Sequence, residues 1–306
     1  MKRLLLTIEE ATCPYRCRYC FANFSQYKSP ITLEHAEAHP ELLADVDFIY
    51  PACDVDLFAL CDGLNILTRA AALRRSISVS TKAVISELDA RVLLKLDEDL
   101  RRYGLFLKIS ISFSTKDHIA TIEPGASSFI ERVTSLKILG EHDIHTCAIL
   151  KPILPGIETS EYLEMLEAFC GVTQNIVVGD LYLDKKGNHL GNEHYDAKLR
   201  RVNWAVNSPL WPVAAAAEKR EAIIHRAEAL EFSVFESDLD LLIALLALRR
   251  NEWVEFGSGS GRRKEWYATR PTQASSFCKT PRYRYGPCKR KMLQTASRSH
   301  RACGDL

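Results

Sequence analysis

Hydrophobic and polar positions follow two alternating patterns over the first 185 residues. Apolar runs rich in β-branched or aromatic residues predict buried or half-buried strands at residues 3–9, 46–51, 77–82, 106–113, 145–150 and 175–183. Between them, apolar residues recur at helical spacing in residues 33–43, 63–74, 88–103, 127–139 and 160–169. Alternating strands and helices with short connections imply parallel strands and right-handed crossovers. We therefore predict an α/β fold, a partial (β/α)6 TIM-like barrel, whose ligands bind at the carboxyl ends of the strands.

The rest of the chain has a different pattern. Two long helical patterns, at residues 214–232 and 239–253, predict a helical extension over residues 186–257. The run Gly257-Ser-Gly-Ser-Gly261 then has the composition of a flexible linker. These changes divide the chain into a barrel at 1–185, a helical extension at 186–257 and a C-terminal segment at 258–306.

Charge is distributed unevenly, although the formal net charge of the 306 residues is only +1. Residues 258–306 hold twelve Lys or Arg against two acidic residues, a net charge of +10, which leaves −9 on the remaining chain. Aromatic residues interleave with these cations: Trp266, Tyr267, Tyr283 and Tyr285. Cations that pair with phosphates and rings that stack on bases are typical of nucleic-acid-binding surfaces. A basic tail that is merely solvated remains the alternative.

The overall composition is that of an ordinary soluble enzyme, with 47% hydrophobic and 26% charged residues. The N-terminal apolar run is too short for a signal peptide, and no apolar stretch is long enough to cross a bilayer. Ten cysteines in such a chain predict cluster ligands and free thiols in a reducing compartment rather than disulfides. We therefore expect a cytoplasmic protein.

Three cysteines, Cys13, Cys17 and Cys20, fall within eight residues directly after the first predicted strand. Three thiolates at spacings of four and three can hold a 4Fe-4S cluster and leave its fourth iron open for a ligand. Tyr19 and Phe21 would shield that cluster from water. A structural zinc site is the alternative, but it normally takes four ligands. The nearest further ligands in the sequence are His35 and His39.

The CxxxCxxC motif, with an aromatic residue before its third cysteine, resembles the signature of the radical S-adenosylmethionine (SAM) enzymes. Motifs at later strand ends, in residues 50–56, 78–82, 108–115, 122–126 and 149–156, resemble the spore photoproduct lyase family of that superfamily. The resemblance covers residues 4–156, about half of the chain. It implies a barrel of the radical SAM type, a 4Fe-4S cluster that binds and cleaves SAM to a 5′-deoxyadenosyl radical, and lyase-like DNA repair. It also implies a flavodoxin- or ferredoxin-type reductase as electron donor.

The resemblance assigns roles to individual residues. Cys13, Cys17 and Cys20 match the cluster ligands. Lys82 and Ser112 match the groups that contact the SAM carboxylate, which suits a fixed cation and a hydrogen-bond donor. The alternative for Lys82 is a lysine at a strand end that extends to solvent. The alternative for Ser112 is a hydroxyl that bonds to the backbone.

Cys53 matches the lyase cysteine that returns a hydrogen atom to the product radical. Simple packing is the alternative, since free cysteine is often buried. Tyr19 matches the first of two tyrosines that relay hydrogen toward SAM, but the second position holds Phe21, which has no O–H group. This departure puts SAM recycling, or the lyase reaction itself, in doubt. Glu123-Pro-Gly predicts a structural turn in which the glycine supplies backbone freedom.

The C-terminal segment carries a weaker resemblance. Arg284, Tyr285 and Lys289 match part of a turn that the lyase places near its DNA lesion. Cys278, Cys288 and Cys303 could form a second metal site, although their spacing matches no recognised motif. The remaining cysteines of the barrel, Cys61, Cys147 and Cys170, are predicted to be core residues.

Three functions are compatible with these observations. The first is a radical SAM enzyme that abstracts hydrogen from a nucleic-acid substrate, with Cys53 and Tyr19 as catalytic residues. The second retains the SAM chemistry but acts on a small molecule or a peptide. The third is a non-enzymatic nucleic-acid-binding protein whose cysteines hold zinc. The first predicts DNA or RNA binding through the basic C-terminal segment.

Overall fold

The computed structural model describes residues 2–8, 11–20, 22, 31–183, 197–201, 210–214 and 216–256. Residues up to Val254 form one compact unit, and a second begins at Glu255, of which only the end of one helix is described. Several predicted features lie outside the described residues: Phe21, the glycine-rich linker, Arg284, Tyr285, Lys289, Cys278, Cys288 and Cys303. The boundaries proposed at 185 and 257 remain predictions.

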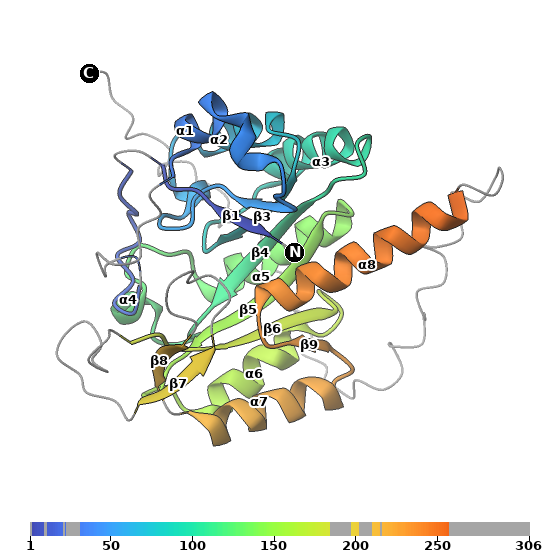
Figure 1. Cartoon of the computed structure of the whole chain (residues 1–306). Coiled ribbons are helices and arrows are strands. Elements are labelled where there is room, and N and C mark those ends of the chain that lie inside the picture. The colour runs from blue at the N-terminus through green and yellow to red at the C-terminus, as the bar shows by residue number, and fades with distance from the viewer. Residues whose placement is uncertain are drawn as a thin grey trace, which may run out of the picture. The chain divides into compact units, whose positions relative to one another are not determined.

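A parallel seven-stranded sheet, open at both edges, organises the first unit (Figure 1). Its strands in spatial order are β1 (Arg3–Leu5), β2 (Phe48–Tyr50), β3 (Ser76–Thr81), β4 (Leu107–Phe113), β5 (His145–Ile153), β6 (Asn175–Asp180) and β9 (Ser233–Phe235). The first six are the predicted strands, in sequence order. The predicted partial barrel is therefore confirmed as an open α/β sheet.

The helices between the strands also match the predicted stretches. They are α1 (Leu33–Ala38) with the 3-10 helix η3 (Pro40–Leu43), α2 (Gly63–Ala72), α3 (Glu87–Arg101), α5 (Phe129–Glu141), α6 (Thr159–Phe169), α7 (Ala217–Ala229) and α8 (Asp238–Phe256). Two short helices lie in the connections that follow β2 and β4: η4 (Leu57–Ala59) and α4 (Ile119–Ile122). Local sequence explains the starts of two of them: Ser86 with Asp89, and Ser128 with Glu131, form capping boxes that satisfy the first N–H groups of α3 and α5.

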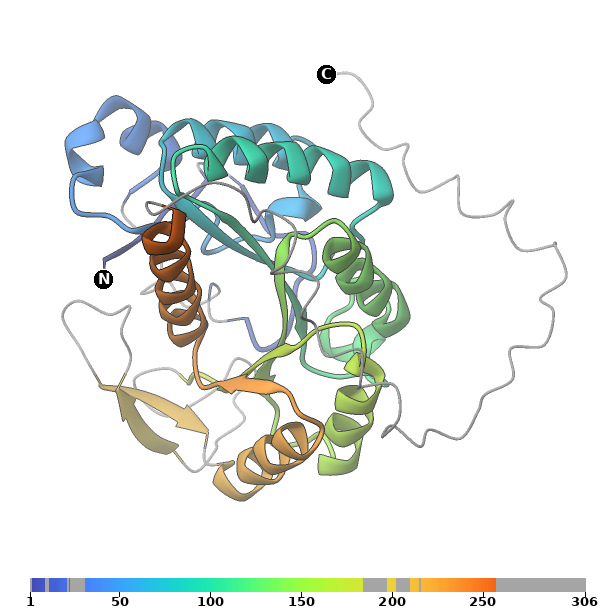
Figure 2. The same cartoon turned by 90° about the vertical axis from the view of Figure 1, so that its right-hand side faces the viewer.

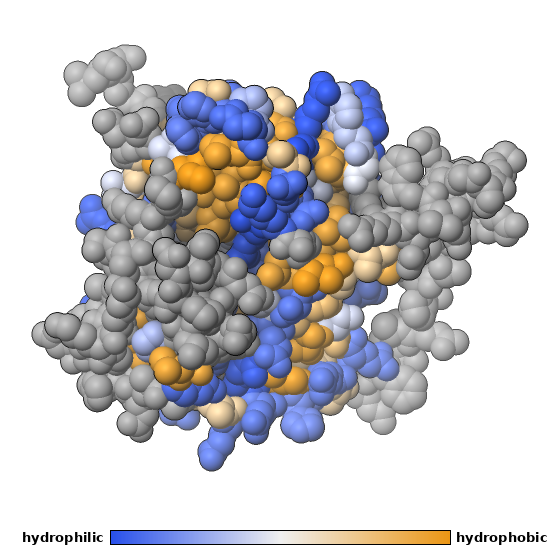
Figure 3. All heavy atoms as spheres, in the orientation of Figure 1, coloured by the Kyte–Doolittle hydropathy of each residue, from blue (hydrophilic) through white to orange (hydrophobic). Residues whose placement is uncertain are grey.

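The two faces of the sheet are covered differently. In Figure 2 helices α3, α5, α6 and α7 follow the outside of the curved sheet, whereas α8 lies on its inner side. Leu241, Leu242 and Leu245 of α8 pack there against Phe48 and Val177 of the sheet. Apolar residues also gather over the first turns of α8 in Figure 3, where Ile243 is 48% exposed. Helix α8 thus closes part of the concave face that a complete barrel would close with strands.

The segment predicted as a helical extension contains three strands that the sequence analysis did not anticipate. Strand β9 pairs with β6, and β7 (Ala197–Arg201) pairs with β8 (Leu210–Ala214) in a separate antiparallel sheet. Strand β9 has only three residues, too few for an alternating pattern to be recognised. Strand β8 contains Pro212, a residue type that argues against a strand because it cannot donate to the ladder. Among the described helices, none is long and apolar enough to cross a membrane.

Candidate active site

The carboxyl ends of the strands bring the sequence-predicted residues of the barrel to one edge of the sheet. The cysteine loop, residues 11–20, follows β1, and Cys53 follows β2. Lys82 follows β3, and Ser112 lies near the end of β4. In parallel α/β sheets this is the edge at which ligands bind.

The cysteine loop is held by the segment that follows β4. The Arg18 N–H donates to the carbonyl of Ile122 at 3.0 Å, and the Gly125 N–H donates to the carbonyl of Tyr15 at 3.2 Å. A Cβ atom at Gly125 would lie 2.7 Å from the carbonyl oxygen of Pro14 and 2.8 Å from the Cα of Tyr15. The glycine of the Glu123-Pro-Gly turn is therefore required for close backbone approach rather than for the conformational freedom predicted from the sequence.

The three cysteines differ in environment. Cys17 is buried, whereas Cys13 and Cys20 are half-buried. Burial raises the pKa of Cys17 to about 12, and Lys82 opposes that rise. The Lys82 ammonium lies 5.6 Å from the centre of the Tyr19 ring, in the same loop. Cys13 and Cys20 raise the pKa of Cys17 further, as neighbouring thiolates do.

The three thiols of the cysteine loop do not surround a preformed metal site in the described part of the chain. Within the described ranges, no three His, Cys, Asp or Glu side chains are placed so that they could hold a metal ion. Three thiols on one anchored loop are nevertheless the ligands that a 4Fe-4S cluster takes, provided that each is deprotonated. Assembly of a cluster would therefore require Cys17 to release its proton.

Tyr19 belongs to a buried polar network beneath the loop. Its hydroxyl donates to the Glu123 carboxylate and accepts a 2.6 Å hydrogen bond from the Ser114 hydroxyl. Glu123 Oε2 in turn forms a 2.8 Å ion pair with Arg132 of α5, and both side chains are fully buried. Burial and then Glu123 raise the pKa of Tyr19 well above its usual value, so this hydroxyl remains protonated.

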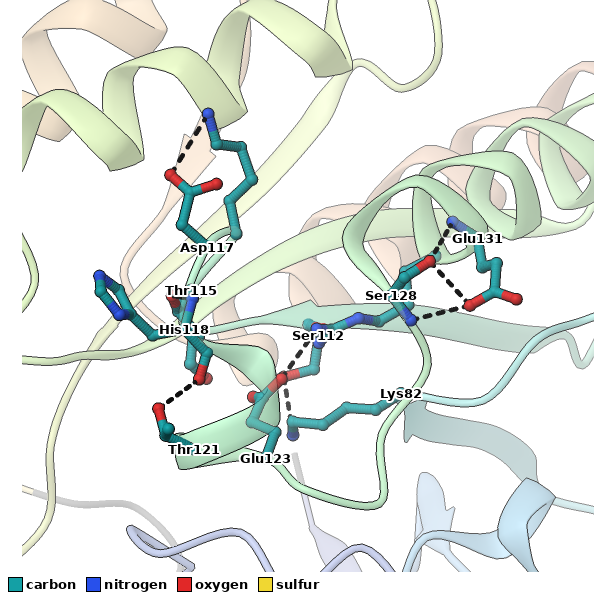
Figure 4. Close-up of polar contacts among 12 residues, drawn as sticks. Lys82, Ser112, Thr115, Asp117, His118, Thr121, Glu123, Ser128 and Glu131 are labelled. Atoms are coloured by element: carbon teal, nitrogen blue, oxygen red, sulfur yellow. Dashed lines mark hydrogen bonds and ion pairs between the residues drawn. The ribbon is translucent and has the colours of Figure 1, made fainter.

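Lys82 and Ser112, which the resemblance paired at the SAM carboxylate, are in direct contact. The Lys82 ammonium donates to the Ser112 hydroxyl at 3.2 Å, as Figure 4 shows. Burial lowers the pKa of Lys82, but Glu123, Cys17 and Asp56 outweigh that effect and raise it overall. Lys82 is thus a fixed cation beside the cysteine loop.

Asp56 is a site residue to which the sequence analysis gave no role. Its carboxylate accepts from the Thr81 hydroxyl and the Lys82 N–H, each at 2.7 Å, and from the Phe58 N–H at 3.2 Å. Burial raises its pKa, and the hydrogen bond from Thr81 opposes the rise. Asp56 therefore fixes the backbone from which Lys82 projects. Only its position five residues after a predicted strand, 46–51, could have indicated this role.

Cys53 lies next to the end of β1, since its N–H donates to the carbonyl of Leu6 at 2.9 Å. Its side chain is half-buried. The structure therefore places Cys53 at the same edge as the cysteine loop, while its role as a hydrogen donor remains a prediction.

The remaining barrel cysteines differ from one another. Cys147 is fully buried, as predicted, and its thiol donates to the Ser110 hydroxyl at 3.3 Å. Cys170 is half-buried at the end of α6. The prediction that Cys61 is a core residue is wrong, because Cys61 lies exposed in the turn between η4 and α2.

Strand β4 and the residue after it carry a row of polar residues along the inner face of the sheet: Lys108, Ser110 and Ser112 in the strand, and then Ser114. At its amino end the fully buried Lys108 pairs with Asp238, the first residue of α8, which also accepts from Ser78 at 3.1 Å. At its other end Ser112 contacts Lys82, and Ser114 contacts Tyr19. One strand thus connects the helix on the concave face with the cysteine loop.

The fold is of the α/β class, with an open parallel sheet. A cysteine loop follows its first strand, and a lysine and a serine lie at the ends of its third and fourth strands. No protein-family model matches the sequence, and no curated protein matches it significantly.

The comparison with solved structures identifies the corresponding fold. A mutant of spore photoproduct lyase with bound AdoMet and dinucleoside spore photoproduct has a TM-score of 0.52 and 13% identity, over 77% of this chain and 82% of that chain. A spore photoproduct lyase complexed with dinucleoside spore photoproduct has a TM-score of 0.51 and 15% identity, over 72% and 73% of the two chains. SuiB from Streptococcus suis has a TM-score of 0.49 and 11% identity, over 78% of this chain and 50% of that chain. The chain therefore has the partial-barrel fold of spore photoproduct lyase, which confirms at the level of fold the resemblance found in the sequence.

Proposed function

We propose that this chain is a radical SAM enzyme that acts on nucleic acid. The contact that carries the proposal is the Lys82–Ser112 pair, whose ammonium lies over the Tyr19 ring of the cysteine loop. The cation and the hydroxyl suit the carboxylate of SAM. The three thiols nearby suit a cluster whose open iron binds SAM. Cys13, Cys17 and Cys20 would hold the 4Fe-4S cluster, which supplies the electron for SAM cleavage.

The chain's own residues would position these groups. Lys82 and Ser112 would bind the SAM carboxylate, Asp56 would hold the Lys82 backbone, and Glu123 would fix the cysteine loop through Tyr19. Cys53, at the same edge, would return a hydrogen atom to the product. A thiol suits that step because its S–H bond is weaker than the C–H bond that forms.

The nucleic-acid substrate is supported by two observations. The fold is that of spore photoproduct lyase, one structure of which holds dinucleoside spore photoproduct. The C-terminal residues 258–306 carry a net charge of +10 in the sequence, which suits a polyanion. Lyase-like repair or modification of a base would require that base to be extruded from its stack.

The test is an anaerobic assay of the cluster-reconstituted protein with SAM and dithionite. 5′-Deoxyadenosine is measured with and without an ultraviolet-irradiated oligonucleotide in deuterated water. We expect the oligonucleotide to change the rate and to be repaired or labelled. Formation of 5′-deoxyadenosine that is indifferent to nucleic acid would instead favour a small molecule or a peptide as substrate.

A matched pair of variants controls the assay. Cys17→Ala should lose both the visible absorbance of the cluster and 5′-deoxyadenosine formation, whereas Cys61→Ala, at an exposed position, should keep both. If the purified protein contains one zinc ion per chain and no iron, and cleaves no SAM, the enzyme assignment fails. The chain would then be a zinc-containing binding protein.

A further inference from the structure

A second cation, Lys151, lies at the same edge of the sheet as Lys82 but on the other side of Ser112. Ile149 of β5 pairs with Val177 of β6, and both pack against α8 on the concave face. Because side chains alternate along β6, position 179 faces the same side as Val177. The Lys151 side chain lies against that position and therefore also faces the concave side, at the point where the register between β5 and β6 shifts. The carbonyl of Lys151 accepts a 3.4 Å hydrogen bond from the Ser112 hydroxyl, so the two cations belong to neighbouring parts of one site.

The Lys151 side chain is held in one direction by its neighbours. Its ammonium lies 3.3 Å from the Tyr182 hydroxyl and 4.7 Å from the centre of the Tyr182 ring. A Cβ atom at Gly179 would lie 2.6 Å from Lys151 Cδ and 2.8 Å from its Cγ. The absence of a side chain at position 179 therefore makes room for the aliphatic part of Lys151.

Charge at this position is not balanced locally. Lys151 forms no ion pair with any residue in the described part of the chain, and its ammonium makes one hydrogen bond there, to Tyr182. An ammonium group has three N–H donors, so two of them make no hydrogen bond to the described residues and suit a ligand. Residues 1–257, in which this cation lies, carry a net charge of −9.

We propose that Lys151 and Tyr182 form a phosphate-binding subsite for a nucleic-acid substrate, separate from the Lys82–Ser112 pair. This inference rests on the proposed function. Lys82 and Ser112 account for one anion, the carboxylate of SAM, and the second cation binds a second one. A phosphodiester suits the subsite because lysine binds phosphate as a point charge and a tyrosine hydroxyl can donate to a phosphate oxygen.

The test measures binding of fluorescein-labelled octathymidylate to the full-length protein by fluorescence anisotropy at several salt concentrations. Lys151→Gln removes the charge, and Gly179→Ala displaces it without removing it. Both should weaken binding about tenfold, because a hydrogen bond to a charged group is lost. The dependence of log K on log salt should become shallower by about 0.7, as for one lost contact to a single strand.

Two matched variants and two further probes make the test decisive. Lys95→Gln changes an exposed lysine, and Gly156→Ala adds a methyl group where nothing lies within 4 Å, so neither should change binding. An octathymidylate with uncharged methylphosphonate linkages should bind equally to all variants. If Lys151→Gln and Gly179→Ala bind octathymidylate as tightly as the wild type, the subsite is refuted. It is also refuted if Lys151→Gln weakens the binding of an octaglutamate peptide but not the binding of octathymidylate.

The same preparations separate this inference from the proposed function. If Lys151→Gln weakens SAM binding more than octathymidylate binding, Lys151 belongs to the cofactor site and the subsite is refuted, while the enzyme assignment stands. If the wild-type protein cleaves no SAM, yet octathymidylate binding depends on Lys151 and Gly179, the enzyme assignment fails and the subsite stands.

Discussion

The Tyr19 hydroxyl donates a hydrogen bond to Glu123 across 104 positions of sequence, and this contact joins the cysteine loop to the segment after β4. Behind it, Glu123 pairs with Arg132, and Arg132 donates to the Ser112 carbonyl at 2.8 Å. The loop that would hold the cluster and the strand that would hold SAM therefore share one buried charged pair.

Loss of the Glu123 charge should destabilise the protein. Glu123→Gln leaves Arg132 buried without a counterion, which costs about 3–5 kcal/mol in the free energy of unfolding. Urea denaturation followed by circular dichroism measures this loss. The matched control is Glu131→Gln, an exposed capping position, which should lose less than about 1 kcal/mol. Equal losses in the two variants would show that the buried pair contributes no more than a surface cap.

Removal of the Lys82 ammonium should weaken SAM binding. Lys82→Met deletes a charged donor to the carboxylate, worth about 1.5–3 kcal/mol, so Kd should rise roughly 10- to 150-fold. Equilibrium dialysis with labelled SAM measures the change. Lys95→Met, which alters an exposed lysine of α3, should bind SAM like the wild type. Wild-type affinity in Lys82→Met would remove this lysine from the cofactor site.

Cys53→Ala should separate SAM cleavage from product formation. The variant lacks the thiol that would return hydrogen to the substrate, so 5′-deoxyadenosine should still form while repaired or modified oligonucleotide falls at least about tenfold, as for a lost proton- or atom-transfer group. Mass spectrometry of the oligonucleotide follows the product. Cys61→Ala should retain product formation. Normal product yield from Cys53→Ala would reduce Cys53 to a packing residue.

Acid should weaken the attachment of α8 to the sheet. Burial raises the pKa of Asp238, but Lys108 outweighs that effect and holds it below its usual value. The unfolded-state pKa of Asp is about 3.9, so the ion pair contributes stability above about pH 4 and loses it as the pH falls through the folded-state value. Asp238→Asn should therefore be less stable than the wild type at neutral pH. Between pH 5 and pH 3 it should lose less stability than the wild type, because the wild type takes up about one more proton on unfolding.

Urea midpoints measured from pH 3 to pH 7 test this sign. The control is Asp240→Asn, two residues further along α8, where the exposed carboxylate accepts from the Ser237 hydroxyl at 2.6 Å. Its pH profile should parallel that of the wild type. An Asp238→Asn profile that also parallels the wild type would show that the Lys108 pair does not set the acid limit.

Most of the sheet could be predicted from the sequence because its strands are buried on both faces. Strand β4 is buried throughout its seven residues, so its apolar and hydroxyl side chains form a run that surface segments lack. Strand β9 could not be predicted, because three residues carry no period. The cysteine loop was found by the spacing of its three thiols, and Lys82 and Ser112 were found through the resemblance of the motifs at the strand ends.

The supporting residues of the site were missed for a different physical reason. Glu123, Arg132 and Asp56 act through contacts between segments that are distant in the sequence, and no local spacing encodes such contacts. Lys108 was missed because a charged residue inside an apolar strand pattern does not indicate burial by itself. Its partner, Asp238, lies 130 positions later in the sequence. Gly125 was correctly placed in a turn, but its close approach to Pro14 depends on where the cysteine loop lies.

The anchoring of the cysteine loop by Ile122, Glu123 and Gly125 also sets an order of events during synthesis. The ribosome makes Cys13, Cys17 and Cys20 more than one hundred residues before it makes the residues that hold them. A nascent chain that ends before β4 has all three thiols but lacks the backbone partners and the carboxylate that fix their loop. A cluster bound by these thiols would therefore gain an anchored loop only after the first four strands have been translated and paired.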